Sequence, residues 1–80
     1  MKGSVAHINP QRSMAAVLTT TGFSILELIG DDVAIGDQLE WDGHPGGRAT
    51  VANLTRGRRF DVYFQNHGVH QSQLRQQLLY

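Results

Sequence analysis

Closely spaced turn signals constrain the fold of this chain more than any other feature. They are Asn9-Pro10, Thr21-Gly22, Gly30-Asp31, Gly36-Asp37, Asp42-Gly43, Pro45-Gly46-Gly47 and Gly57. Glycine supplies positive φ angles and proline presets φ, so these residues favour tight turns. Between the turns lie short segments with apolar residues at every second position, at residues 3–9, 14–19, 23–28, 38–42 and 48–54. This pattern predicts five β-strands, and five strands in so short a chain predict a closed barrel.

The segment after Gly57 adds one further strand to this prediction. Phe60, Val62 and Phe64 occupy every second position, a period that indicates a strand at about residues 60–64. Alternation places these three side chains on one side, most naturally toward the core.

The C-terminal residues have a different composition, rich in glutamine, leucine and arginine. These residue types form helices readily, so we expect a helix at about residues 70–79. Leu74 and Leu78 are four positions apart and share one helix face. Val69 packs against Leu74 if His70 is the cap position. A helix this short is marginal on its own and must pack against the barrel or against a partner.

Length and composition limit the chain to one small domain. The chain has 80 residues. We expect residues 1–55 to form the barrel and residues 56–80 to form an extension packed on the same domain. Cysteine is absent, which excludes disulfides and thiolate chemistry. No apolar run approaches the roughly 18 residues of a membrane span, and no signal-peptide pattern occurs. We therefore expect a soluble, cytoplasmic protein.

No motif predicts catalysis or a cofactor. No serine or cysteine stands in a nucleophile motif, and the glycines match no phosphate-cradling loop. His67 and His70 form a His-Gly-Val-His pair, but zinc sites need a third or fourth ligand. We expect a binding module rather than an enzyme, without metal or cofactor.

Three segments, KGSVAHINPQRSMAAVLTTTGFSILEL, GDQLEWDG and GRATVANLT, resemble the cold-shock domain. The matching positions are Lys2-Gly3, Val5, Asn9, Gly22, Gly36-Asp37, Leu39, Trp41, Gly47, Ala49 and Leu54. The resemblance covers about residues 1–54. It implies a five-stranded oligonucleotide-binding (OB) barrel, a fold that grips single-stranded nucleic acid. The expected fold class is therefore a mainly β, five-stranded OB-type barrel with an extra C-terminal strand or extended segment and a short C-terminal helix.

The aromatic platform of the cold-shock family is missing from this sequence. In that family, rings on the first three strands stack on bases. The aligned positions here hold His7, Ile8, Met14, Ala16 and, approximately, Leu26 and Leu28. Stacking contributes about 1 to 3 kcal/mol per base. The resemblance thus implies the barrel, whereas the usual binding mode is not expected.

Two functional hypotheses from different classes remain. Seven basic and seven acidic residues cancel, but basic residues gather in the segment TRGRRFDVYF. The first hypothesis is arginine-dependent binding of RNA or single-stranded DNA through Arg48, Arg56, Arg58 and Arg59, with Lys2, Arg12 and His7. Alternatively, these arginines only form a solvated loop.

The second hypothesis is a protein-interaction or dimerisation module that has lost nucleic-acid binding. It places a partner on an apolar outer surface that includes Met14, Ala16, Leu26 and Leu28. The competing interpretation is that the C-terminal helix covers this surface through Leu74, Leu78 and Leu79. The sequence leaves both interpretations open.

Overall fold

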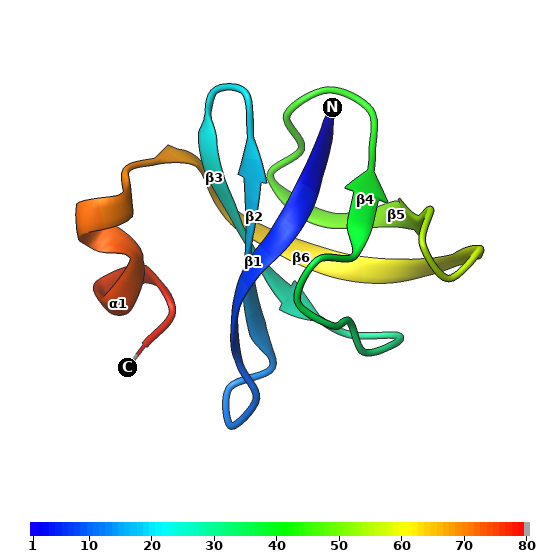
Figure 1. Ribbon diagram of the computed structural model, residues 1–80, viewed down its shortest axis with the longest axis horizontal. Helices are drawn as coiled ribbons and strands as arrows, with labels where there is room; N and C mark the ends of the chain where they lie inside the picture. The colour runs from blue at the N-terminus through cyan, green and yellow to red at the C-terminus, as the bar shows by residue number, and fades with distance from the viewer. Residues whose placement is uncertain (80) are drawn as a thin grey trace.

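The computed structural model describes residues 1–79 as six strands followed by a short helical segment (Figure 1). In chain order these are β1 (Lys2–Asn9), β2 (Met14–Thr19), β3 (Gly22–Leu28), β4 (Gln38–Glu40), β5 (Gly47–Asn53), β6 (Arg58–Val69), a 3₁₀ turn η1 (Gln71–Gln73) and α1 (Leu74–Gln77). Tyr80, the last residue of the predicted extension, lies outside the described residues. The mainly β fold with a short C-terminal helix is confirmed.

The strands form one closed, antiparallel barrel in the order β1-β2-β3-β6-β5-β4, with β4 paired to β1. β6 lies between β3 and β5 and pairs with both of them. Closure removes the exposed strand edges that an open sheet would present. The architecture is compatible with an OB-like fold.

β6 is part of the barrel wall, which differs from the extension predicted for residues 56–80. It has 12 residues, far more than the short strand expected there. Phe60, Val62 and Phe64 are buried, as their alternation predicted. These three side chains fill the barrel interior, so the wall needs β6 to complete the core. The barrel therefore extends to Val69 and has six strands where five were expected.

Buried side chains form two clusters on opposite sides of the same strands. The barrel interior holds Val5, Ala15, Val17, Leu26, Val33, Leu39, Trp41, Val51, Phe60, Val62 and Phe64. An outer cluster holds Met14, Ala16, Phe23, Ile25, Val69, Leu74 and Leu78. Successive strand residues point to opposite faces, so β2 is buried on both of its faces.

The helical segment that completes the outer cluster is shorter than the helix predicted for residues 70–79. The α-helical part has only four residues. His70 caps η1 because its Nδ1 accepts a hydrogen bond from the Ser72 N–H at 3.1 Å. Val69 and Leu74 pack in the outer cluster. The predicted cap and the predicted packing of these two side chains are confirmed.

A buried hydrogen bond anchors the end of the helical segment to the barrel. Asn9 Nδ2, at the end of β1, donates to the Leu78 carbonyl oxygen at 2.8 Å. Asn9 and Leu78 are both almost fully buried, so this bond is shielded from water. Among residues 1–79, no helix has the length and apolarity to cross a membrane.

Glycine is required where the β2–β3 turn meets the end of β6. Gly22 has a φ of +112°, which residues with side chains rarely adopt. A Cβ at this position would lie 3.1 Å from the carbonyl carbon of Gly68, which itself has a φ of +64°. Beside this close approach, Val69 at the end of β6 still pairs with Phe23 of β3, and the chain then continues into the helical segment.

Candidate nucleic-acid interface

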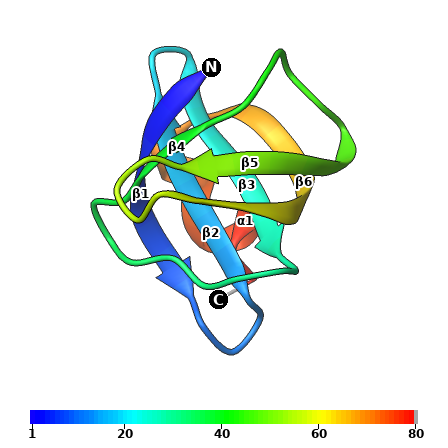
Figure 2. The same ribbon diagram turned by 90° about the vertical axis from the view of Figure 1, so that its right-hand side faces the viewer.

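Arg48 and the three arginines of the basic segment, Arg56, Arg58 and Arg59, belong to the β5–β6 hairpin. The tip of this hairpin points away from the barrel, at the opposite end of the molecule from α1 (Figure 1). Figure 2 shows β5 and β6 side by side, joined by the loop at the tip. The register pairs Arg48 with Tyr63, Thr50 with Asp61 and Ala52 with Arg59. Side chains alternate along each strand, so these six residues share the outward surface. We call Arg48, Thr50, Arg59, Asp61 and Tyr63 the hairpin face.

Arg48 is held on the hairpin face by a carboxylate of the neighbouring strand. Its Nε and Nη2 atoms donate to Asp61 Oδ2 at 3.1 and 2.9 Å, and Thr50 Oγ1 donates to Asp61 Oδ1 at 2.9 Å. The bonds from Arg48 and then Thr50 lower the pKa of Asp61 below its ordinary value. The Arg48 side chain remains 67% exposed. A guanidinium has five N–H groups, so most of its donors still face solvent.

Tyr63 is the exposed aromatic ring of this surface. Its neighbours Val62 and Phe64 point into the core, which turns Tyr63 outward with 44% exposure. It lies directly opposite Arg48 in the strand register. A planar ring beside a positioned guanidinium offers a nucleic acid a stacking surface and a phosphate ligand together.

Arg56 has a structural position in the turn of the hairpin. Its Nε lies 3.2 Å from Asp37 Oδ2, which also accepts hydrogen bonds from Asn53 Nδ2 at 2.9 Å and the Ala34 N–H at 3.0 Å. Asn53 Oδ1 in turn accepts from the backbone N–H of Arg56 at 3.1 Å. This network ties the hairpin tip to the β3–β4 loop.

Asp37 is ionised more readily than an ordinary aspartate despite its burial. Burial raises the pKa of Asp37, but the Ala34 and Asn53 hydrogen bonds and the charge of Arg56 outweigh it, and the pKa lies below the ordinary value. The hairpin tip therefore contacts a buried carboxylate that is ionised at neutral pH.

Arg58 and Arg59 point to opposite sides of β6. Arg58 Nη1 contacts Asp31 Oδ2 at 3.1 Å, away from the hairpin face, and stays 61% exposed. The Asp32 N–H bond and then Arg58 lower the pKa of Asp31. Arg59 is exposed and contacts no carboxylate among residues 1–79. Arg48 lies opposite Tyr63 on the hairpin face, and Arg59 is a second cation farther along the same face, beyond Asp61.

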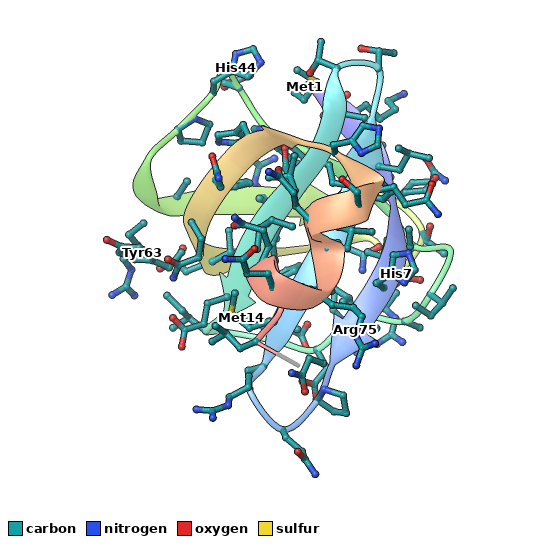
Figure 3. All side chains as sticks on the ribbon, turned by 90° about the vertical axis from the view of Figure 1, so that its left-hand side faces the viewer. Met1, His7, Met14, His44, Tyr63 and Arg75 are labelled. Atoms are coloured by element: carbon teal, nitrogen blue, oxygen red, sulfur yellow. The ribbon has the colours of Figure 1, made fainter. Side chains whose placement is uncertain are left out.

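The other three predicted nucleic-acid-binding residues lie elsewhere. Lys2 is opposite Glu40 in the β1–β4 register. The His7 ring lies 6.0 Å from the Phe23 ring, between ring centres, and Figure 3 shows His7 and Tyr63 on opposite sides of α1. Arg12 is in the β1–β2 turn. The structure does not bring these residues together with the hairpin face.

The residues predicted for a protein partner do not form a shared exposed surface. Met14 and Ala16 lie in the outer cluster with Leu74 and Leu78, at 4% and 0% exposure. Leu26 points into the barrel, and Leu28 is half-buried against the same interior cluster. The helical segment therefore covers β2, which was the competing interpretation of these apolar residues.

A serine–histidine contact, which the sequence did not suggest, lies behind the β4–β5 loop. His67 Nε2 is 2.7 Å from the Pro45 carbonyl oxygen, and His67 Nδ1 is 2.8 Å from Ser24 Oγ. A carbonyl oxygen only accepts, so Nε2 donates the hydrogen bond to Pro45. A nucleophile must reach its substrate, yet Ser24 is only 2% exposed. The contact fastens the loop to the wall.

Among residues 1–79, no group of three or more His, Cys, Asp or Glu side chains could hold a metal ion. The two histidine rings of this region, His44 and His67, have centres 5.6 Å apart. Both ring nitrogens of His67 already have hydrogen-bond partners. This part of the chain therefore offers aromatic packing rather than ligands.

Comparison of the chain with protein-family models, with curated proteins and with solved structures finds no significant match.

Proposed function

We propose that the hairpin face binds single-stranded nucleic acid by an arginine-dependent mode that differs from the cold-shock mode. The observation that carries the proposal is the placement of Tyr63 opposite Arg48 on an exposed surface, with Arg59 farther along the same face. Phosphate contacts supply affinity, and an aromatic ring accepts any base because every base has a π-face. The face combines both kinds of contact.

The resemblance to the cold-shock family supports the barrel but assigns binding to another surface. The family positions that would carry stacking rings include Met14 and Ala16, and both are buried beneath the helical segment. A strand of nucleic acid cannot reach them while Leu74 and Leu78 are docked. The hairpin face lies on β5 and β6, outside the surface that the helical segment covers, and stays open.

The neutral net charge is compatible with this proposal because the carboxylates are used locally. Asp37 and Asp31 contact Arg56 and Arg58 away from the hairpin face. On the face itself, Asp61 orients Arg48 and leaves most of its N–H groups exposed. The expected binding is modest and strongly salt-dependent, since few phosphates are contacted.

The test is a fluorescence-anisotropy titration of the protein with short labelled DNA and RNA strands across a series of salt concentrations. We expect the double variant Arg48→Gln and Arg59→Gln to bind more weakly and to reduce the salt slope by about two, one for each lost phosphate contact. Tyr63→Ala should lose about 1 to 3 kcal/mol of binding free energy.

The matched control is Arg75→Gln, which removes the same charge from α1 on the side away from Tyr63 (Figure 3). It should leave both affinity and salt slope unchanged. Absence of binding at low salt contradicts the proposal. Equal losses in the Arg75 and hairpin variants would reduce it to unspecific charge attraction.

A further inference from the structure

A polar cleft lies between α1 and the outer surface of β2, β3 and β6. Its volume is about 590 Å³, within the range of small-molecule sites. Polar lining comes from Arg12, Glu27, Gln65, Gln76 and Gln77, and apolar lining comes from Met14 and Leu79. The β1–β2 turn, three strands and the helical segment thus converge on one hollow.

The polar side chains that line this cleft form no ion pair or side-chain hydrogen bond with residues 1–79. The ion pairs among residues 1–79 use Arg48, Arg56 and Arg58, and none includes Arg12 or Glu27. Within the same residues, no side-chain hydrogen bond involves the three glutamines of the lining. A guanidinium, a carboxylate and three carboxamides therefore remain available to one ligand.

The cleft is continuous with the hairpin face through the strand register. Arg48 is opposite Tyr63, Tyr63 is opposite Glu27, and Glu27 is opposite Met14. Directly opposed residues have Cβ atoms about 4.5 to 5.5 Å apart. Figure 3 shows Met14 on the same side of α1 as Tyr63. A strand stacked on Tyr63 therefore has its next base within reach of the cleft.

We infer that the cleft binds an unstacked guanine of the strand held on the hairpin face, an inference that rests on the proposed function. Guanine presents two acceptors, O6 and N7, which a guanidinium such as Arg12 contacts in bidentate fashion. Its N1–H and N2–H donors point the same way, and the two oxygens of Glu27 accept both. The other bases lack two adjacent donors beside two adjacent acceptors.

The apolar lining and the amides complete this recognition. Leu79, which is 56% exposed, offers contact to one face of a planar base, while glutamine amides both donate and accept at its edges. The hairpin face contacts phosphates and stacks one ring on a base, and neither contact distinguishes the bases. The cleft would add this preference.

The test compares an oligothymidine strand with three strands of the same length that carry one central guanine, adenine or cytosine. The full chain should bind the guanine strand about tenfold more tightly than oligothymidine. Glu27→Gln should abolish this ratio because an amide supplies only one acceptor. Glu40→Gln removes the same charge outside the cleft and should keep the ratio.

The outcomes separate this inference from the proposed function. If all four strands bind equally and Arg48→Gln still weakens them, guanine recognition is wrong and the hairpin face stands. A guanine preference that survives Glu27→Gln also overturns the inference, because the base is then read elsewhere. If no strand binds at low salt, the proposed function fails and this inference with it. Glu27 is exposed, so the variant should fold, which circular dichroism verifies.

Discussion

The outer surfaces of β2–β3 and of the β5–β6 hairpin both consist of every second side chain along their strands. The helical segment covers the first surface, whereas solvent covers the second. On β2–β3, the outward residues Met14, Ala16 and Ile25 are buried by the helical segment. On the hairpin, the outward residues Arg48 and Tyr63 are exposed. Residue type therefore decides which face of this small barrel is covered and which faces solvent.

The covered surface leaves no room for aromatic rings at the positions where the cold-shock resemblance would place them. Ala16 is 0% exposed and contributes to the cluster with Leu74 and Leu78. A phenylalanine ring at this position would overlap the docked segment, since a closely packed cluster has no spare volume. Stacking rings and a docked helix exclude each other on one surface. The proposed nucleic-acid contact therefore uses another face.

The largest expected effect tests whether the helical segment that covers β2 contributes to the stability of the fold. Leu78→Ala removes a side chain that is 1% exposed in the outer cluster. The free energy of unfolding should fall by about 2 to 5 kcal/mol, the range for buried leucines, in urea denaturation monitored by circular dichroism. Leu79→Ala, beside it and 56% exposed, should change it little.

If the two leucine variants are equally stable, the helical segment is only loosely attached. In that case Met14 and Ala16 become accessible, and the comparison between a covered and an open face fails.

The second expected effect concerns how the open hairpin is anchored. The helical segment packs on β2 mainly through apolar side chains. The tip of the hairpin is instead attached to the β3–β4 loop by polar contacts among Asp37, Asn53 and Arg56. Asp37→Asn places an amide where three donors converge, which should cost about 1 to 3 kcal/mol at neutral pH. Urea denaturation at a series of pH values measures this difference against Asp42→Asn, an exposed carboxylate variant.

The pH dependence follows from the direction of the Asp37 pKa. The folded-state pKa lies below the ordinary value of 3.8. The carboxylate therefore stabilises the fold above pH 3.8, and this contribution is lost as the pH falls through the folded-state pKa. The difference between wild type and Asp37→Asn should shrink across that acidic range. A difference that is constant with pH would contradict a charged Asp37.

Much of the fold could be predicted because its signals are local. Alternation placed Phe60, Val62 and Phe64 in the core, and the same pattern turns Tyr63 outward. Turn residues marked the strand ends. The position of β6 between β3 and β5 was missed, because strand order depends on pairing between distant segments and not on the period within one segment.

The candidate site was less predictable for the same reason. Basic residues near Tyr63 were visible in the sequence, but their carboxylate partners lie 13 to 27 positions away. The Ser24–His67 contact spans 43 positions. Neither Glu27 nor the glutamines of the cleft stood out, because exposed polar residues carry no period that distinguishes a ligand from a solvated side chain.

The smallest expected change in stability sharpens the comparison on the hairpin face itself. Asp61→Asn removes the charge that pairs with Arg48 at the surface. Exposed ion pairs contribute little to folding, so the free energy of unfolding should change no more than in Asp42→Asn.

Oligonucleotide binding by Asp61→Asn should respond differently, because Arg48 loses its carboxylate competitor and the hairpin face gains positive charge. We expect tighter binding and a salt slope larger by about one. Unfolding and anisotropy titrations of the same samples measure both. Weaker binding by Asp61→Asn would mean that this carboxylate positions Arg48 more than it competes for it.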